Sequence, residues 1–195
     1  GPRSIMVCAA GGLPGELHKL WRAVDGVAYH LEYGYSCMGY EIAGGLGAKL
    51  AAPERDVYVL VGDGSYLMMN SEIATSVALG TKLTIVMLDN RGFGCIERLQ
   101  RACGGASFNN KRRAPAIDFA AHARSLGAIA DKVEDISELE QALARAKRAD
   151  RTTVIVINTD PTRGTAEGGA WWDVAVSEAP RNGPARAVRR RYERM

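Results

Sequence analysis

Two side chains with hard oxygen atoms, those of Asp63 and Asn90, stand in short polar motifs 27 residues apart. In proteins Mg²⁺ binds one or two such carboxylate or amide oxygens, together with phosphate oxygens and water. Gly64 and Ser65 suit an anion, because a glycine lets the backbone approach a ligand and successive N–H groups can point at it. These residue types therefore predict a Mg²⁺ ion that holds a diphosphate.

The segments in front of the two motifs explain why they would meet. Residues 57–61 and 83–88 are apolar runs, which predict parallel strands covered on both faces. Each polar motif follows one of these strands directly, and a helical segment at residues 71–79 lies between them. Such a crossover returns the chain in the same direction, so both motifs reach the carboxyl edge of one sheet, where α/β proteins bind ligands.

A simple turn is the alternative interpretation of the Gly-Asp-Gly sequence, because such sequences are common in turns. The second motif favours a ligand site, since its residue types, its spacing and its preceding strand all agree. The sequence contains neither a G-x-G-x-x-G nor a Walker A motif. A dinucleotide site, and with it a flavin, is therefore not expected.

The rest of the chain alternates between strand and helix patterns, which predicts an α/β fold with a three-layer, doubly wound parallel sheet. Further strands are predicted at residues 5–8, 29–32 and 153–158, and further helices at 14–24, 39–51, 118–126 and 137–148. Gly44, Gly45 and Gly47 weaken the second of these helices, which indicates close packing on a neighbouring element.

The 195 residues, of which 47% are hydrophobic, fit one globular domain. Residues 1–4 are interpreted as a cloning remnant, residues 5–176 as the domain, and residues 177–195 as a basic, flexible tail. From Arg181 onward the chain has six arginines and one acid. Binding of this tail to nucleic acid or to a membrane surface is the alternative to a solvated chain end.

Several classes of protein are not expected. The sequence lacks the run of roughly 18 apolar residues that spans a membrane, and its main body lacks the basic surface of a nucleic-acid binder. The four cysteines show no C-x-x-C spacing, so a zinc site or a thioredoxin-like centre has little support. Free thiols in a reducing cytoplasm are the simplest interpretation.

Residues 62–94 resemble the thiamin diphosphate motif of the decarboxylase and acetolactate synthase superfamily, in which Gly-Asp-Gly is followed after a spacer by a pair ending in Asn. The resemblance implies the thiamin diphosphate-binding fold, with Mg²⁺ bound by Asp63, Asn90 and the backbone carbonyl of Gly92. Asp89 departs from the pattern, because the superfamily usually has a first Asn there. The metal ligand is the second residue of the pair, so the assignment of Asn90 stands.

The same resemblance implies three further contacts with the cofactor. Met38 would hold thiamin diphosphate in a bent shape, and the Ser36 carbonyl would accept a hydrogen bond from the pyrimidine amino group. His18 resembles a position that contacts the diphosphate. On residue type alone, Met38 also fits core packing and His18 also fits a surface position.

A closer resemblance, over residues 7–176, is to the trihydroxycyclohexane-1,2-dione hydrolases of inositol breakdown. Its most specific parts are residues 33–40 and 169–173. It implies an enzyme that opens a six-membered cyclic diketone by hydrolysis, with the cofactor as electron sink. Trp171 and Trp172 are expected to close over the cofactor edge or to dock on other domains, and burial of both indoles in a local cluster is the alternative.

The resemblance also implies a missing partner. Superfamily enzymes activate the cofactor with a glutamate from an N-terminal pyrimidine-binding domain, and this chain starts just before its first predicted strand. We therefore expect the last domain of a longer dimeric or tetrameric enzyme, with no catalytic residue of its own. Two alternatives stay open: an acetolactate synthase-like carboligase or 2-oxo acid decarboxylase, and a non-catalytic diphosphate-binding module.

Overall fold

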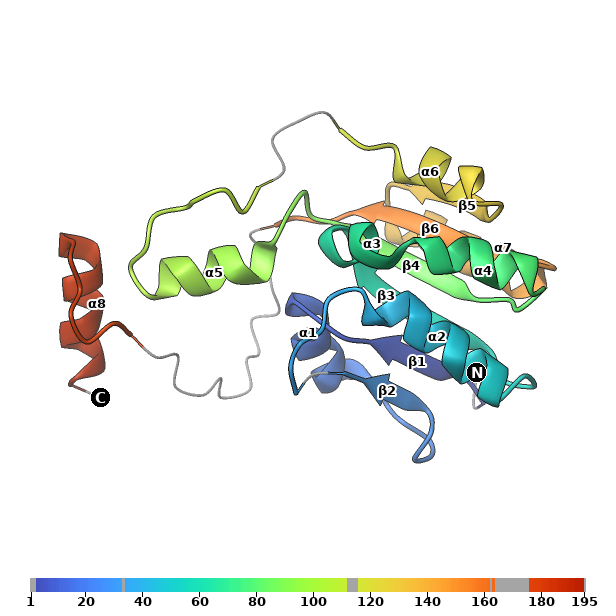
Figure 1. Ribbon diagram of the computed structural model, residues 1–195, viewed down its shortest axis with the longest axis horizontal. Coiled ribbons are helices and arrows are strands. Elements are labelled where there is room, and N and C mark those ends of the chain that lie inside the picture. The colour runs from blue at the N-terminus through green and yellow to red at the C-terminus, as the bar shows by residue number, and fades with distance from the viewer. Residues whose placement is uncertain (1–2, 33, 112–115, 162, 164–175, 195) are drawn as a thin grey trace.

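The computed structural model describes residues 3–32, 34–111, 116–161, 163 and 176–194. Its centre is a parallel sheet with the strand order β2-β1-β3-β4-β6-β5. Helices lie on both faces of this sheet (Figure 1). The predicted α/β fold with a three-layer parallel sheet is therefore confirmed.

Strands and helices alternate along most of the described chain. The strands are β1 Ile5–Cys8, β2 Tyr29–Leu31, β3 Val57–Gly62, β4 Thr84–Asp89, β5 Ile129–Val133 and β6 Thr153–Asn158. The helices are α1 Gly12–Leu20, α2 Tyr40–Ala51, α3 Asp63–Met69, α4 Ser71–Ala78, α5 Gly94–Ala102, α6 Phe119–Ser125, α7 Ile136–Arg148 and α8 Gly183–Tyr192.

The register of β3 and β4 decides where the two polar motifs lie. Gly62 at the end of β3 pairs with Leu88 of β4, so the residues that follow both strands leave the sheet at the same edge. From β1 the chain goes to one side to form β2 and to the other side to form β3. The ends of β1 and β3 therefore flank the switch point of the sheet, where α/β folds bind ligands.

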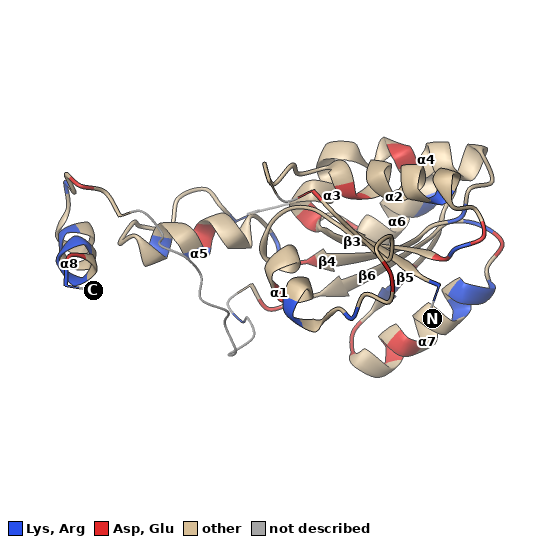
Figure 2. Cartoon of the chain, turned by 90° about the horizontal axis from the view of Figure 1, so that it is seen from below, with Lys and Arg blue, Asp and Glu red and all other residues tan. Residues whose placement is uncertain are grey.

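Packing on the two faces fixes these strand ends. Helices α2, α3, α4 and α6 cover one face of the sheet, and α1 and α7 lie on the other (Figure 2). The larger core includes Ile42 of α2, Tyr66 of α3 and Phe119 of α6. Burial of each such side chain contributes about 1.5–3 kcal/mol. Ala142 and Ala146 of α7 form a smaller core on the other face.

The glycines of α2 have different surroundings. A Cβ atom on Gly45 would lie 2.4 Å from Cγ2 of Val59 in β3, so this glycine lets the helix pack directly on the sheet. Gly44 faces the ring of Tyr40 in its own helix, and Gly47 has open space around it. Close packing on a neighbouring element is therefore confirmed for Gly45 and wrong for Gly47.

Four described elements, α3, α5, β5 and α8, were not predicted from the sequence. Helix α8 lies within the segment expected to be a flexible tail, and the Asn182 side chain caps it by accepting a hydrogen bond from the Ala185 N–H at 2.8 Å. Helices α5 and α8 lie away from the sheet at one end of the molecule (Figure 1). Within the described residues no helix is long and apolar enough to cross a bilayer.

Candidate cofactor and metal site

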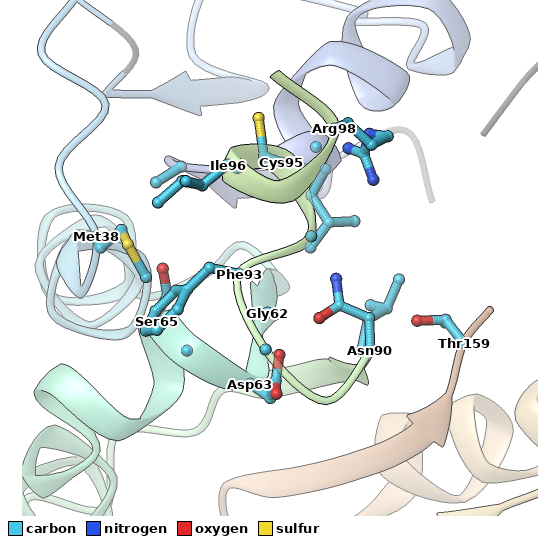
Figure 3. A pocket seen from close by; sticks show the side chains of 18 of the residues that line it. Met38, Gly62, Asp63, Ser65, Asn90, Phe93, Cys95, Ile96, Arg98 and Thr159 are labelled. Carbon is cyan, nitrogen blue, oxygen red and sulfur yellow. The ribbon is translucent and has the colours of Figure 1, made fainter. Parts of the chain in front are cut away.

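A cavity of about 610 Å³ opens at the carboxyl edge of the sheet, beyond the ends of β1, β3 and β4 (Figure 3). Asp63, Gly64 and Ser65 line it from the first turn of α3, and Asn90 lines it from the end of β4. Thr159 adds a hydroxyl from the end of β6. The two polar motifs therefore meet in one cavity, as the crossover predicted.

Asp63 is the first residue of α3 and only 1% exposed. A carboxylate at this position is favoured by the partial positive charge of the helix start. A Cβ atom on the next residue, Gly64, would lie 2.7 Å from the Phe93 ring. The glycine therefore lets the start of α3 approach the segment that precedes α5.

The amide oxygen of Asn90 is buried and has no hydrogen-bond partner. A buried polar atom without a partner costs about 1–3 kcal/mol, so its presence points to a ligand. In Figure 3 this oxygen is directed toward the side of the cavity where the Asp63 carboxylate lies. An amide oxygen beside a buried carboxylate is a donor set that suits Mg²⁺.

The turn after β4 is held from several directions. The Arg91 N–H donates to Asp89 Oδ1 at 2.9 Å, so the Asp at this position stabilises the turn with its own side chain. Gly92 has a φ of 147° and pairs with Lys111 in an isolated antiparallel bridge. A Cβ atom on Gly92 would lie 2.2 Å from the Asn110 carbonyl oxygen. These contacts fix Gly92 at the cavity, which it lines.

The cavity also contains residues that the sequence motifs did not indicate. Gly11, in the turn after β1, and Gly12, the first residue of α1, line it together with Arg98 of α5. A Cβ atom on Gly12 would lie 2.3 Å from Nη2 of Arg98, so the guanidinium group lies against the start of α1. The two glycines closely follow the first predicted strand in the sequence. Arg98 was not indicated as a site residue, because no helix was predicted over residues 94–102.

The remaining predicted cofactor contacts lie in two places. Ser36 and Met38 line the cavity, and Met38 Cε would be 3.2 Å from a Cβ atom on Gly64. His18 is not among the cavity residues, and its ring packs edge-on against Tyr29 with centroids 5.5 Å apart. The structure thus brings together all the predicted cofactor and metal residues except His18.

Within the part of the chain that the structure describes, no group of three or more His, Cys, Asp or Glu residues could hold a metal ion. Among the residues predicted to bind Mg²⁺, Asp63 supplies a carboxylate, Asn90 an amide and Gly92 a backbone carbonyl, and all three line the cavity. Such a small set of protein ligands fits a Mg²⁺ ion whose shell is completed by diphosphate oxygens.

Similarity to known proteins identifies the family. Residues 9–157 match the model of the thiamine pyrophosphate enzyme family, C-terminal TPP binding domain. The chain belongs to this family. The cavity residues lie within this matched range, except Thr159, Asp160 and Arg163, which follow β6.

Curated relatives named 3D-(3,5/4)-trihydroxycyclohexane-1,2-dione hydrolase are similar to the whole chain. The protein of Halalkalibacterium halodurans is 42% identical over 201 residues, which cover 100% of this chain and 32% of the relative. The protein of Bacillus subtilis is 41% identical over 195 residues, covering 97% of this chain and 30% of the relative. The chain thus spans about a third of the length of these relatives.

Solved structures with the same fold include two decarboxylases. The thiamine diphosphate-dependent 4-hydroxybenzoylformate decarboxylase of Rhodococcus jostii superposes with a TM-score of 0.74 at 22% identity, over 80% of this chain and 29% of that protein. The benzoylformate decarboxylase of Polynucleobacter necessarius gives 0.74 at 21% identity, over 81% of this chain and 30% of that protein. At these identities the likeness concerns the fold alone.

Trp171 and Trp172 lie outside the described residues, as do all the other residues of the specific segment 169–173.

Proposed function

We propose that this chain is the C-terminal cofactor-binding domain of a thiamin diphosphate-dependent hydrolase that opens the ring of trihydroxycyclohexane-1,2-dione in inositol degradation. The observation that carries this proposal is the 42% identity over the whole chain to relatives that bear the hydrolase name. Identity to the decarboxylases of the same fold is only 22%. A carboligase or decarboxylase function is therefore less well supported.

Mg²⁺ is part of the proposal, with Asp63, Asn90 and the backbone carbonyl of Gly92 as its protein ligands. The burial of Asp63 and the unpartnered amide oxygen of Asn90 support it. The glycine turn after β1 and the Arg98 guanidinium line the same cavity and suit the charge of a diphosphate.

When bound, thiamin diphosphate supplies the electron sink for breaking the bond between two neighbouring carbonyl carbons. The residues of this chain bind and orient it. Met38 lies against Gly64 and would support the ring end of the cofactor, while Asp63 and Asn90 would hold the diphosphate end. Leu88 and Phe93 line the cavity with apolar surface, which limits the water beside the cofactor.

The activating glutamate belongs, in this proposal, to a pyrimidine-binding domain in the N-terminal part of the complete protein. The length of the relatives leaves room for such a domain. Apolar side chains of α3 and α5 that are exposed near the cavity suit contact with it or with a second copy of the enzyme. These residues are Leu67, Met68, Met69, Ile96 and Leu99.

We also propose a cytoplasmic location for the complete protein. None of the four cysteines, all of which the structure describes, forms a disulfide, although Cys37, Cys95 and Cys103 are not buried. Accessible cysteines without disulfides are typical of a reducing compartment.

The experiment that tests the function uses the complete protein with thiamin diphosphate and Mg²⁺. The cyclic diketone should be consumed only when both are present, and mass spectrometry should detect an open-chain deoxy sugar acid. Pyruvate and benzoylformate serve as alternative substrates. Turnover of these 2-oxo acids without turnover of the diketone would establish a decarboxylase or carboligase instead. Cofactor binding without any turnover would favour the non-catalytic module.

A further inference from the structure

Glu41 is a carboxylate buried next to the cofactor cavity without lining it. It is the second residue of α2 and is 1% exposed. The Gly39 N–H donates to its Oε2 at 3.0 Å, and the Ala10 N–H donates to its Oε1 at 3.4 Å. The Ser65 hydroxyl also acts on this carboxylate and lowers the pKa of Glu41. One side chain therefore connects three segments that are far apart in the sequence.

Each of these three segments forms a wall of the cavity. Ala10 lies in the turn after β1 and lines the cavity itself. Gly39 does not line the cavity, but it directly follows Met38, which does. Ser65 and the preceding Gly64 both line the cavity. The spacing between the three walls therefore depends on a single carboxylate.

The donors around Glu41 match an ionised carboxylate. An ionised carboxylate only accepts hydrogen bonds and has about four acceptor positions on its two oxygens. Besides the N–H groups of Ala10 and Gly39, the Ser65 hydroxyl and the backbone N–H of Glu41 also favour the ionised form. Burial raises the pKa of Glu41, and these hydrogen bonds act in the opposite direction. An apolar residue would fill the same space without that penalty, so packing alone does not explain a Glu here.

We propose that Glu41 is a positioning residue for thiamin diphosphate. It holds the turn after β1, the turn that carries Met38 and the start of α3 at the spacing that the cofactor requires. Because Glu41 does not line the cavity, it acts through Ala10, Gly39 and Ser65 rather than by touching the cofactor. The inference rests on the proposed cofactor site and adds a residue to which no motif gave a role.

The test is Glu41→Gln in the complete protein. The amide has the size of the carboxylate, but its NH₂ group must face a backbone N–H that now has no acceptor. With Mg²⁺ present, the Kd of the apoenzyme for thiamin diphosphate, measured by calorimetry, should rise about tenfold or more, as expected for losing a hydrogen bond to a charged group. The KM for the cyclic diketone at saturating cofactor should not change. An unchanged Kd would overturn the proposal.

Ser76→Ala is the matched control for a general loss of stability. The Ser76 hydroxyl is fully buried in α4 and hydrogen-bonds to Thr152 Oγ1 at 2.8 Å, away from the cavity residues. This variant should lower the Tm of the complete protein and leave the Kd for the cofactor unchanged. An equal rise in Kd for Ser76→Ala and Glu41→Gln would also overturn the proposal.

A second variant covers the case in which Glu41→Gln does not fold. Glu41→Asp keeps the charge but shortens the side chain, so it cannot reach all three segments and should also raise the Kd. An unchanged Kd for Glu41→Asp would count against the proposal. Failure of the wild-type protein to bind thiamin diphosphate would instead refute the proposed function, whereas equal binding by wild type and Glu41→Gln would refute only the positioning role.

Discussion

Gly92 is a position where a single added methyl group should damage the site. Its φ of 147° and the 2.2 Å distance from an added Cβ atom to the Asn110 carbonyl oxygen leave no room for a side chain. Gly92→Ala should cost about 1–3 kcal/mol of stability and raise the Kd for thiamin diphosphate. Thermal unfolding and calorimetry check both. Gly26→Ala, where a Cβ atom meets nothing within 4 Å, should change neither.

Asp63 is the residue on which the proposed metal site depends most. Asp63→Ala in the complete protein should abolish the Mg²⁺-dependent binding of thiamin diphosphate, because the site then has no carboxylate among its proposed ligands. Calorimetry with and without Mg²⁺ measures this. Asp131→Ala is the control, since Asp131 pairs with Arg145 at the far edge of the sheet. Tight Mg²⁺-dependent binding by the Asp63 variant would contradict the assignment.

Single site residues could be predicted from the sequence where a suitable polar residue directly follows an apolar strand. Asp63 and Asn90 could be predicted because each follows an apolar strand directly. The place of Arg98 against Gly12 could not be predicted, since it depends on the direction in which α5 leaves the sheet, and a local sequence pattern does not contain that direction. The connection of Glu41 to Ala10 likewise depends on a tertiary contact.

Among the elements, α2 offers a direct comparison of two glycines. Gly45→Ala should destabilise the domain, because its Cβ atom would lie 2.4 Å from Val59 in the core. Gly47→Ala should stabilise it by up to about 1 kcal/mol, since Gly47 is exposed, has open space and lies inside a helix. Chemical denaturation of the two variants tests this, and equal effects would contradict it.

Helix α5 is connected to the loop after it through Glu97. Hydrogen bonds from Ser107, Asn110 and Arg101 hold the pKa of Glu97 below its usual value of 4.5, although burial opposes the shift. A carboxyl with a lowered pKa stabilises the fold above its unfolded pKa and loses this contribution as the pH falls through the folded pKa.

Glu97→Gln should therefore lower the Tm most above pH 4.5, and the difference from wild type should shrink as the pH falls below that value. Thermal unfolding across this range measures the difference. Glu140→Gln, at an exposed position in α7, serves as the control and should show little difference at any pH. A difference for Glu97→Gln that grows in acid would contradict the role of this network.

The elements that sequence patterns predicted are those with strong apolar runs, such as β3 and β4. Strand β5 was missed because it lies at the edge of the sheet and only two of its five residues are buried. Helix α8 was missed because its arginines dominate the composition of the segment. Such elements are determined by long-range contacts and capping, which a local pattern does not contain.

For the molecule as a whole, we predict that this chain alone folds but binds thiamin diphosphate weakly and has no turnover. The cores on both faces of the sheet are formed within the chain, whereas the proposed activating glutamate lies elsewhere. Cooperative thermal unfolding, calorimetry and an activity assay test the three parts. Turnover of the diketone by the isolated chain would contradict the proposal that the activating glutamate lies in another domain of the complete protein.

The pairing of β3 with β4 also determines which changes of length the domain tolerates. Asp63 and Asn90 meet because Gly62 lies opposite Leu88, whatever the number of residues between them. Insertions at residues 80–82, at the opposite edge of the sheet, would leave this pairing intact. One residue inserted within β4 would displace Asn90 by about 3.3 Å along the strand direction. It would also turn the side chains on one side of the insertion to the opposite face of the sheet. Distant homologues can therefore vary the spacing between the two motifs, but not the junction between each motif and its strand.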